Sequence, residues 1–178
     1  MSDNSVVPTT DSWLRHTLAT LAYRAEKALR DAPPQFAEFR ASPRSRPALA
    51  LVAHLGDLLE WGTRMTRGEM RWVPVAQTSW TAATDRFFAA LAEFDAALAA
   101  PPAECLRHEV IFQGPIADAL THVGQLNMMR GMFGAPVRPE SYARAAISSG
   151  QVGRDQSGGA RVEFDGDASP QETHQRDP

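Results

Sequence analysis

The sequence predicts an all-α protein, a four-helix bundle, and three observations support that prediction. Apolar residues recur three or four positions apart, the spacing of one helix face, in four separate segments of the chain. Proline and glycine lie between those segments, where they end one helix and allow the next to begin. The chain has 178 residues, of which 43% are hydrophobic and 22% charged, and this composition suits one globular domain with its own core.

The first two helices are predicted from their caps and their apolar stripes. The first should begin near Ser12, a good N-cap residue, and end before Pro33 and Pro34. A segment with turn character then leads to a second helix of roughly 20 residues, which starts with Pro47 in the favoured first position. The stripe of this second helix consists of Leu51, His54, Leu55, Leu58, Trp61 and Met65.

The second and third helices are separated by a long connection, residues 68–77. About ten residues at ~3.3 Å each can span the length of a bundle, so these two helices need not be antiparallel neighbours. Thr78 or Ser79 is expected to cap the third helix, and Pro101 and Pro102 stop it.

The fourth helix is expected over residues 115–133. A Gly-Pro pair precedes it, and Gly134 and Pro136 follow it as typical C-terminal residues. The short apolar run 110–112 could be extended, and a short helical turn is expected around 140–147.

The composition changes after the last predicted turn. Residues 148–178 are polar and Gly-rich, and such a segment buries too little apolar surface to offset its ordering entropy. We therefore predict a flexible N-terminus over 1–11, a bundle over 12–147 and a disordered tail over 148–178. The tail holds six acidic and three basic residues, so the rest of the chain carries equal numbers of each sign. No basic face is evident, and a nucleic-acid partner is not expected.

The remaining composition bears on location. A lone cysteine, Cys105, excludes an intrachain disulfide, and the first residues lack the basic and apolar segments of a signal peptide. No stretch approaches the ~20 apolar residues of a membrane-spanning helix. A soluble, cytoplasmic protein without a membrane partner is expected.

A polar stripe on the fourth helix carries the candidate chemistry. Asp118, His122 and Gln125 lie at i, i+4 and i+7 in an otherwise apolar setting. An ionised carboxylate buried without a partner is costly, and a nearby cation removes that cost. Side chains at i and i+4 share one helical face, so Asp118 and His122 can converge on one ion.

The second helix offers a matching residue, His54, within its apolar stripe. Two imidazoles and one carboxylate would give a metal three ligands and leave one position open, as in catalytic sites. This set suits zinc, nickel or ferrous iron, and the spacing does not choose among them.

Plainer interpretations stay open from the residues alone. His54 could be a hydrogen-bonded core residue, and Asp118 lies in the first turn of its predicted helix, where the macrodipole favours a carboxylate without a metal. Asp57 could support His54 or be a surface charge. Cys105 and His108, at i and i+3, could pair as thiolate and imidazole, but no orienting carboxylate is evident.

Three runs together resemble the DinB/YfiT-like superfamily: LATLAYRAEKALRDAPPQF, LALVAHLGDLLEW and GPIADALTHVGQL. The resemblance covers residues 12–147. It implies a four-helix bundle of DinB type with a long connection between the second and third helices, one divalent metal ion and, often, a homodimer.

The resemblance also implies a ligand set. Family members have a histidine in the second helix and an HxxxH pair in the fourth, commonly followed by RGQ. His54 matches the first position, His122 the last, and residues 124–125 the end of the tripeptide. Asp118 replaces the first histidine of the pair and Val123 replaces the arginine. The mycothiol-dependent maleylpyruvate isomerases are similar, with a carboxylate in an ExxxH pair.

The function implied is a thiol-dependent S-transferase or isomerase, in which the metal activates a low-molecular-weight thiol toward a small-molecule substrate. Gln125 and Arg130 are expected to contact the cofactor or substrate, and no residue is assigned as catalytic. The alternatives are a non-catalytic, stress-related bundle that binds metal or a small ligand, and a metal-assisted hydrolase.

Overall fold

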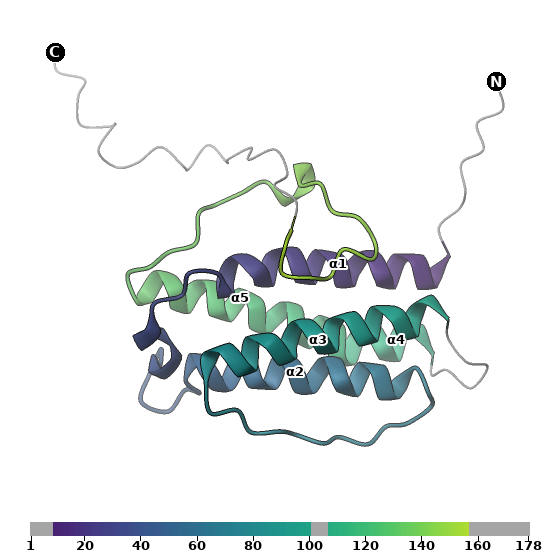
Figure 1. The fold of residues 1–178 in the computed structure, drawn as a ribbon, viewed down its shortest axis with the longest axis horizontal. Coiled ribbons are helices and arrows are strands. Elements are labelled where there is room, and N and C mark those ends of the chain that lie inside the picture. Colours follow the sequence, from purple (N-terminus) through teal and green to yellow (C-terminus); the bar gives the residue numbers. More distant parts are fainter. Residues whose placement is uncertain (1–8, 101–106, 157–178) are drawn as a thin grey trace, which may run out of the picture.

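The computed structural model describes residues 9–100 and 107–156, and this part of the chain is all-helical, as predicted (Figure 1). Its long helices are α1 (Thr10–Leu29), α2 (Ala48–Met65), α3 (Trp80–Ala99) and a fourth built from α4 (His108–Ile111), the π-helical turn η2 (Phe112–Ile116) and α5 (Ala117–Met132). Two short 3₁₀ turns, η1 (Pro34–Glu38) and η3 (Tyr142–Arg144), lie outside them.

The helix starts agree closely with the predicted caps. Thr9 caps α1 by accepting a 3.2 Å hydrogen bond from the Ser12 amide, so α1 begins slightly earlier than expected. Pro47 precedes the first residue of α2 instead of occupying it. Ser79 caps α3 through a 3.1 Å bond from the Ala82 amide.

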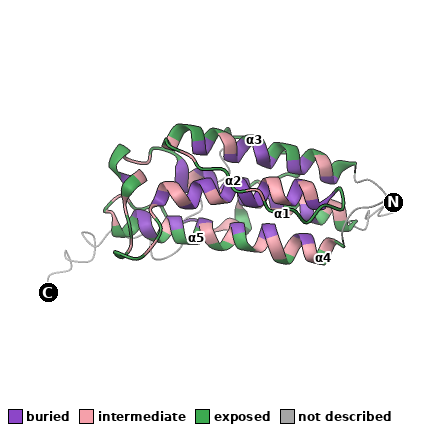
Figure 2. Cartoon of the chain, turned by 90° about the horizontal axis from the view of Figure 1, so that it is seen from below, coloured by how far each residue is buried: buried purple, intermediate pink, exposed green. Residues whose placement is uncertain are grey.

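The four long helices form a bundle in which sequence neighbours are not always spatial neighbours. α1 packs against α3 and α5, and α2 packs against the same two helices, so α1 and α2 lie diagonally opposite each other (Figures 1 and 2). The connection 66–79 runs along the bundle from the end of α2 to the start of α3, and these two helices therefore run in the same direction (Figure 1).

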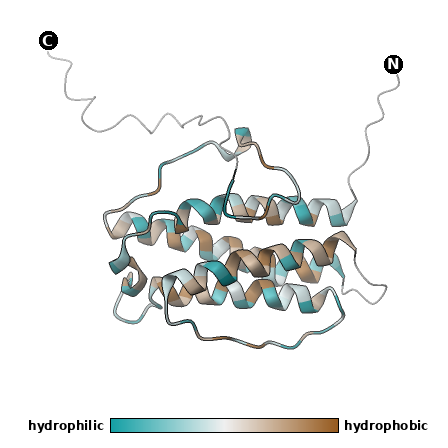
Figure 3. Cartoon of the chain, in the orientation of Figure 1, coloured by the Kyte–Doolittle hydropathy of each residue, from teal (hydrophilic) through white to brown (hydrophobic). Residues whose placement is uncertain are grey.

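The core lies along the shared axis of the helices. Each helix presents a buried face inward and polar residues outward, a pattern visible in the burial and in the hydropathy of the ribbon (Figures 2 and 3). The largest fully buried side chains are Phe36, Phe87, Phe94, Leu14, Leu18, Leu21, Leu55, Leu59, Met65, Leu91, Leu98 and Ile111.

Buried polar groups fasten the long connection to the bundle. The Asp57 carboxylate is 5% exposed and accepts hydrogen bonds from the Val75 amide at 2.9 Å and the Arg86 guanidinium at 2.7 Å. The Trp61 indole donates to the Met70 carbonyl at 3.1 Å. Asp57 is thus neither a surface charge nor a hydrogen-bond partner of His54: it holds the connection.

The fourth helix begins at His108 and not at Pro115, which corrects the prediction of a start at the Gly-Pro pair. Pro115 has no N–H and its ring crowds the preceding turn, both of which oppose a regular α-helix. The wider π turn of η2 contains Pro115, and the helix continues through it. The apolar run 110–112 is therefore helical and not extended.

The segment after α5 returns across α1 (Figure 1). Glu140, which is 6% exposed, accepts a hydrogen bond from the Tyr23 hydroxyl and pairs with Lys27, both on α1. The predicted helical turn around 140–147 corresponds to the shorter η3.

The predicted boundary of the tail at residue 148 is also corrected. Val152 is 6% exposed and belongs to the core, and Arg154 pairs with Asp85 on α3. The chain thus packs against the bundle through Val152 and Arg154, and the described residues extend to Gln156. The remainder of the predicted tail, 157–178, and residues 1–8 of the predicted flexible N-terminus lie outside the described residues. Among the described helices, none has the length and apolar character needed to cross a membrane.

Candidate metal centre

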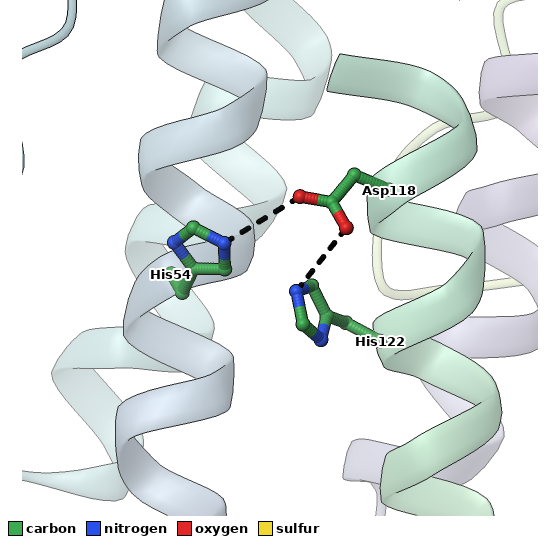
Figure 4. Close-up of side chains that lie close together, drawn as sticks. All are labelled: His54, Asp118 and His122. Atoms are coloured by element: carbon green, nitrogen blue, oxygen red, sulfur yellow. Dashed lines mark ion pairs between the residues drawn. The ribbon is translucent and has the colours of Figure 1, made fainter. Parts of the chain in front are cut away.

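The three predicted ligands meet between α2 and α5. His54 lies in the middle of α2, and Asp118 and His122 lie one helical turn apart on α5, which packs against α2. Their side chains point toward one another, with the Asp118 carboxylate between the two imidazoles (Figure 4). The structure thus brings together residues that are more than sixty positions apart in sequence.

The separations resemble those of atoms around a common centre. Oδ2 of Asp118 lies 3.7 Å from Nε2 of His54, and Oδ1 of Asp118 lies 3.4 Å from Nε2 of His122. All three potential ligand atoms lie within 4.8 Å of one another. Ligand atoms about 2.1 Å from a tetrahedral ion lie roughly 3.4 Å apart, so the Oδ1–His122 distance equals that separation and the Oδ2–His54 distance is slightly longer.

The environment of Asp118 removes one plainer interpretation. Because the helix continues through η2 back to His108, Asp118 lies inside a longer helix and not at its start. The free N–H groups that stabilise a carboxylate are confined to the first turn, so the macrodipole does not explain this residue. Asp118 is also 47% exposed at its side chain, and it lines a pocket together with His54 and His122.

Gln125 fixes the orientation of His122. Nδ1 of His122 lies 2.7 Å from Oε1 of Gln125, one turn further along α5. An amide oxygen only accepts hydrogen bonds, so Nδ1 carries the proton and Nε2 presents its lone pair toward Asp118. This is the arrangement in which a second hydrogen bond orients a metal-binding histidine.

The position of His54 favours its neutral form. Burial lowers the pKa of this imidazole, and the nearby His122 and the positive charge of Arg46 lower it further. The Trp72 ring, from the long connection, lies edge-on to the His54 ring at 5.5 Å. A neutral imidazole is the state that binds metal ions.

The three side chains line one wall of a pocket of about 500 Å³. Arg46 and Asp118 are its charged lining residues, while Leu51 and Met129 form a buried apolar wall. The full lining is Ala41, Ser45, Arg46, Leu51, His54, Asp118, His122, Gln125, Met128 and Met129. Gln125, expected near the cofactor, is among them.

Arg130 is not part of this pocket, and its expected contact with a substrate is corrected. Its side chain is buried and donates hydrogen bonds to the carbonyls of Ala28 at 3.1 Å, Arg30 at 3.0 Å and Ala135 at 2.8 Å. Burial lowers the pKa of its guanidinium. Arg130 satisfies carbonyl groups at the ends of α1 and α5, where a cation is favoured.

The other chemical candidates of the sequence lie apart from this pocket. Nε2 of His108 lies 2.5 Å from the Asp11 carboxylate at the start of α1. Its proposed partner, Cys105, is outside the described residues. His16 is exposed on α1.

Two residues near the site were not predicted, Arg46 and Trp72. Both lie in irregular segments, where apolar periodicity gives no information on direction. A signal for Arg46 does exist in the sequence, since it immediately precedes Pro47, the N-cap of α2, and lies eight residues, about two helical turns, before His54.

Comparison of the chain with protein-family models, with curated proteins and with solved structures gives no match.

Proposed function

We propose that this chain is a metal-dependent enzyme of DinB/YfiT type that activates a low-molecular-weight thiol for S-transfer or isomerisation. The observation that carries the proposal is the convergence of His54, Asp118 and His122 on the wall of one pocket. The long connection between the parallel helices α2 and α3 is in keeping with the DinB-type bundle (Figure 1).

The donor set fits a divalent transition metal. Two imidazole nitrogens and one carboxylate oxygen suit zinc, nickel or ferrous iron, and three protein ligands leave a position for a further ligand. His54, Asp118 and His122 would hold the ion. Bound there, the ion would supply a strong positive charge that lowers the pKa of a coordinating thiol to below neutrality.

The chain's own residues prepare the site. Gln125 keeps the proton of His122 on Nδ1, so that Nε2 faces the site as a base. The burial of His54 lowers the pKa of its ring and so favours the neutral form. Asp118 contributes the single negative charge of the ligand set and remains open to the pocket.

The pocket has the size of a small-molecule site. Ligand sites commonly measure about 300–1,000 Å³ and combine apolar walls with a few polar groups. Here Leu51 and Met129 are the buried walls, and the polar groups are the three ligands, Ser45, Arg46 and Gln125. A homodimer and a cytoplasmic location remain predictions of the sequence.

Metal content tests the first half of the proposal. We expect the purified protein to retain about one equivalent of divalent metal per chain, and His54→Ala or His122→Ala to lose it with little change in helical content. His16→Ala removes an exposed histidine of α1 and should leave the metal content unchanged. Elemental analysis with circular dichroism measures both quantities. Full retention of metal by the two site variants would refute the site.

Thiol binding tests the second half. In the cobalt-substituted protein, a thiol that binds the ion should produce a new sulfur-to-metal absorption band, accompanied by the release of protons. If no thiol changes the spectrum at millimolar concentration but an ester or amide is hydrolysed, metal-assisted hydrolysis replaces thiol transfer. If neither occurs, the non-catalytic bundle is the better description.

A further inference from the structure

Arg46 is the positive charge of the pocket. Among the described residues that line it, Arg46 is the cation and Asp118 the anion. Asp118 faces the two imidazoles at 3.4 and 3.7 Å as a member of the ligand set, whereas the Arg46 guanidinium forms no ion pair within the described part of the chain. An unpaired guanidinium beside a ligand pocket is suited to receive a carboxylate or phosphate group.

The segment that carries Arg46 is held in place by hydrogen bonds. Residues 42–45 form a turn in which the Ser45 amide donates to the Ser42 carbonyl at 3.0 Å. The Ser45 hydroxyl accepts from the Ser42 amide at 3.0 Å and donates to the Ser42 carbonyl at 2.9 Å. Arg40 adds a 2.5 Å bond to the Ser45 carbonyl. Pro47, directly after Arg46, has a fixed φ and is the N-cap residue of α2. The backbone at Arg46 is therefore pre-organised.

The charge balance of the site adds to this argument. The carboxylate of Asp118 would cancel only half of the charge of a divalent ion, and Arg46 contributes a further positive charge to the same pocket. The buried side chains of Leu51 and Met129 supply an apolar wall beside these positive groups. The pocket thus combines an open coordination position on the proposed metal, an apolar wall and the positive charge of Arg46.

We propose that Arg46 selects the substrate of this site by binding an anionic group, so that the preferred ligand is a small thiol with a carboxylate or phosphate elsewhere in the molecule. The proposal rests on the proposed function for the thiol, but the charge preference can be tested separately from it. From the sequence, Arg130 was expected to contact the substrate; in this proposal Arg46 makes that contact instead.

The experiment compares probes that differ in charge alone. Isothermal titration of the full-length protein loaded with one equivalent of zinc, after removal of free metal, would measure binding of 3-mercaptopropionate and of its neutral amide, 3-mercaptopropionamide. A second pair without sulfur, succinate and succinamide, measures the charge preference independently of thiol chemistry. We expect the anionic member of each pair to bind about ten-fold more tightly, the low end for a hydrogen bond to a charged partner.

The variant Arg46→Gln should abolish that preference by weakening the anionic probes about ten-fold while leaving the neutral probes and the zinc content unchanged. Arg44→Gln is the matched control, because Arg44 lies on the same segment, is exposed and does not line the pocket. It should behave as the wild type.

Each outcome decides a different point. If only the succinate pair shows the Arg46-dependent preference, thiol binding is refuted and the anion selectivity stands. If the preference survives in Arg46→Gln, disappears equally in Arg44→Gln, or is absent because no anionic probe binds at tens of millimolar, the role of Arg46 is overturned.

Discussion

At the scale of single residues, the site depends on hydrogen bonds that orient side chains of ordinary type. His122 presents Nε2 to the site because Gln125 holds Nδ1, and Asp118 lies between two imidazoles without a strong hydrogen bond to either. Asp118, His122 and Gln125 lie at i, i+4 and i+7, so their common helical face could be predicted from their spacing alone. Spacing alone does not show that His54 lies beside them, because that contact depends on the packing of α2 against α5.

Gln125→Ala should weaken zinc binding by about 10–100-fold, the usual effect of removing the partner of a metal-binding histidine. The reason is that the His122 ring loses its fixed tautomer and orientation. Thr121→Ala, an exposed substitution on the same helix, should leave the affinity unchanged. Competition with a chromogenic zinc chelator measures both dissociation constants. Equal affinities in Gln125→Ala and the wild type would show that the hydrogen bond has no such role.

At the scale of helices, the sequence determines most of the elements but not how they continue or approach each other. Caps such as Ser79 were predictable because a side chain bonds a nearby amide, a local interaction. The start of the fourth helix was not, because Pro115 normally ends a helix and only the π turn of η2 accommodates it. Arg130 was placed in the pocket because helical spacing does not show which carbonyl groups lie nearby in the fold.

The close approach of α2 and α3 provides a test at this scale. A Cβ atom at Gly62 would lie 2.5 Å from Cζ of the buried Phe94 ring, so Gly62→Ala should destabilise the protein by about 1–3 kcal/mol despite the better helix propensity of alanine. At Gly124, in the middle of α5, an added Cβ meets nothing within 4 Å.

Gly124→Ala is therefore the control, and it should stabilise the protein by about 0.5–1 kcal/mol. Urea unfolding followed by circular dichroism gives both values. If Gly62→Ala were as stable as Gly124→Ala, the two helices would not be in close contact at this point.

At the scale of the whole molecule, the segment after α5 is part of the domain. Composition predicted a tail from residue 148, because few apolar residues follow it and each looks insufficient alone. The structure instead places Val152 in the core and Arg154 over the Phe88 ring at 5.3 Å. The mean composition of a polar segment does not reveal that one apolar residue in it, here Val152, packs into the core.

Truncation separates these two parts of the C-terminal region. Removal of residues 148–178 should lower Tm by roughly 5 °C, since burial of a valine side chain contributes about 1.5–3 kcal/mol and Arg154 loses its contacts with α3. Removal of 157–178 alone should change Tm little, because that part is polar and Gly-rich. Differential scanning calorimetry of both variants distinguishes the cases, and equal Tm values for the two would contradict the docking of Val152.

The diagonal placement of α1 and α2 has a consequence for how the chain folds. In a bundle whose consecutive helices are antiparallel neighbours, each helical hairpin can form early with a short loop. Here α1 must wait for α3, and α2 can pack on α3 only after the connection 66–79 has closed along the length of the bundle (Figure 1). The entropy of closing these long loops is lost before the packing energy is gained, which raises the folding barrier above that of a simple up-down bundle of equal size. The topology that brings His54 beside Asp118 and His122 is thus also the one that slows the formation of the fold.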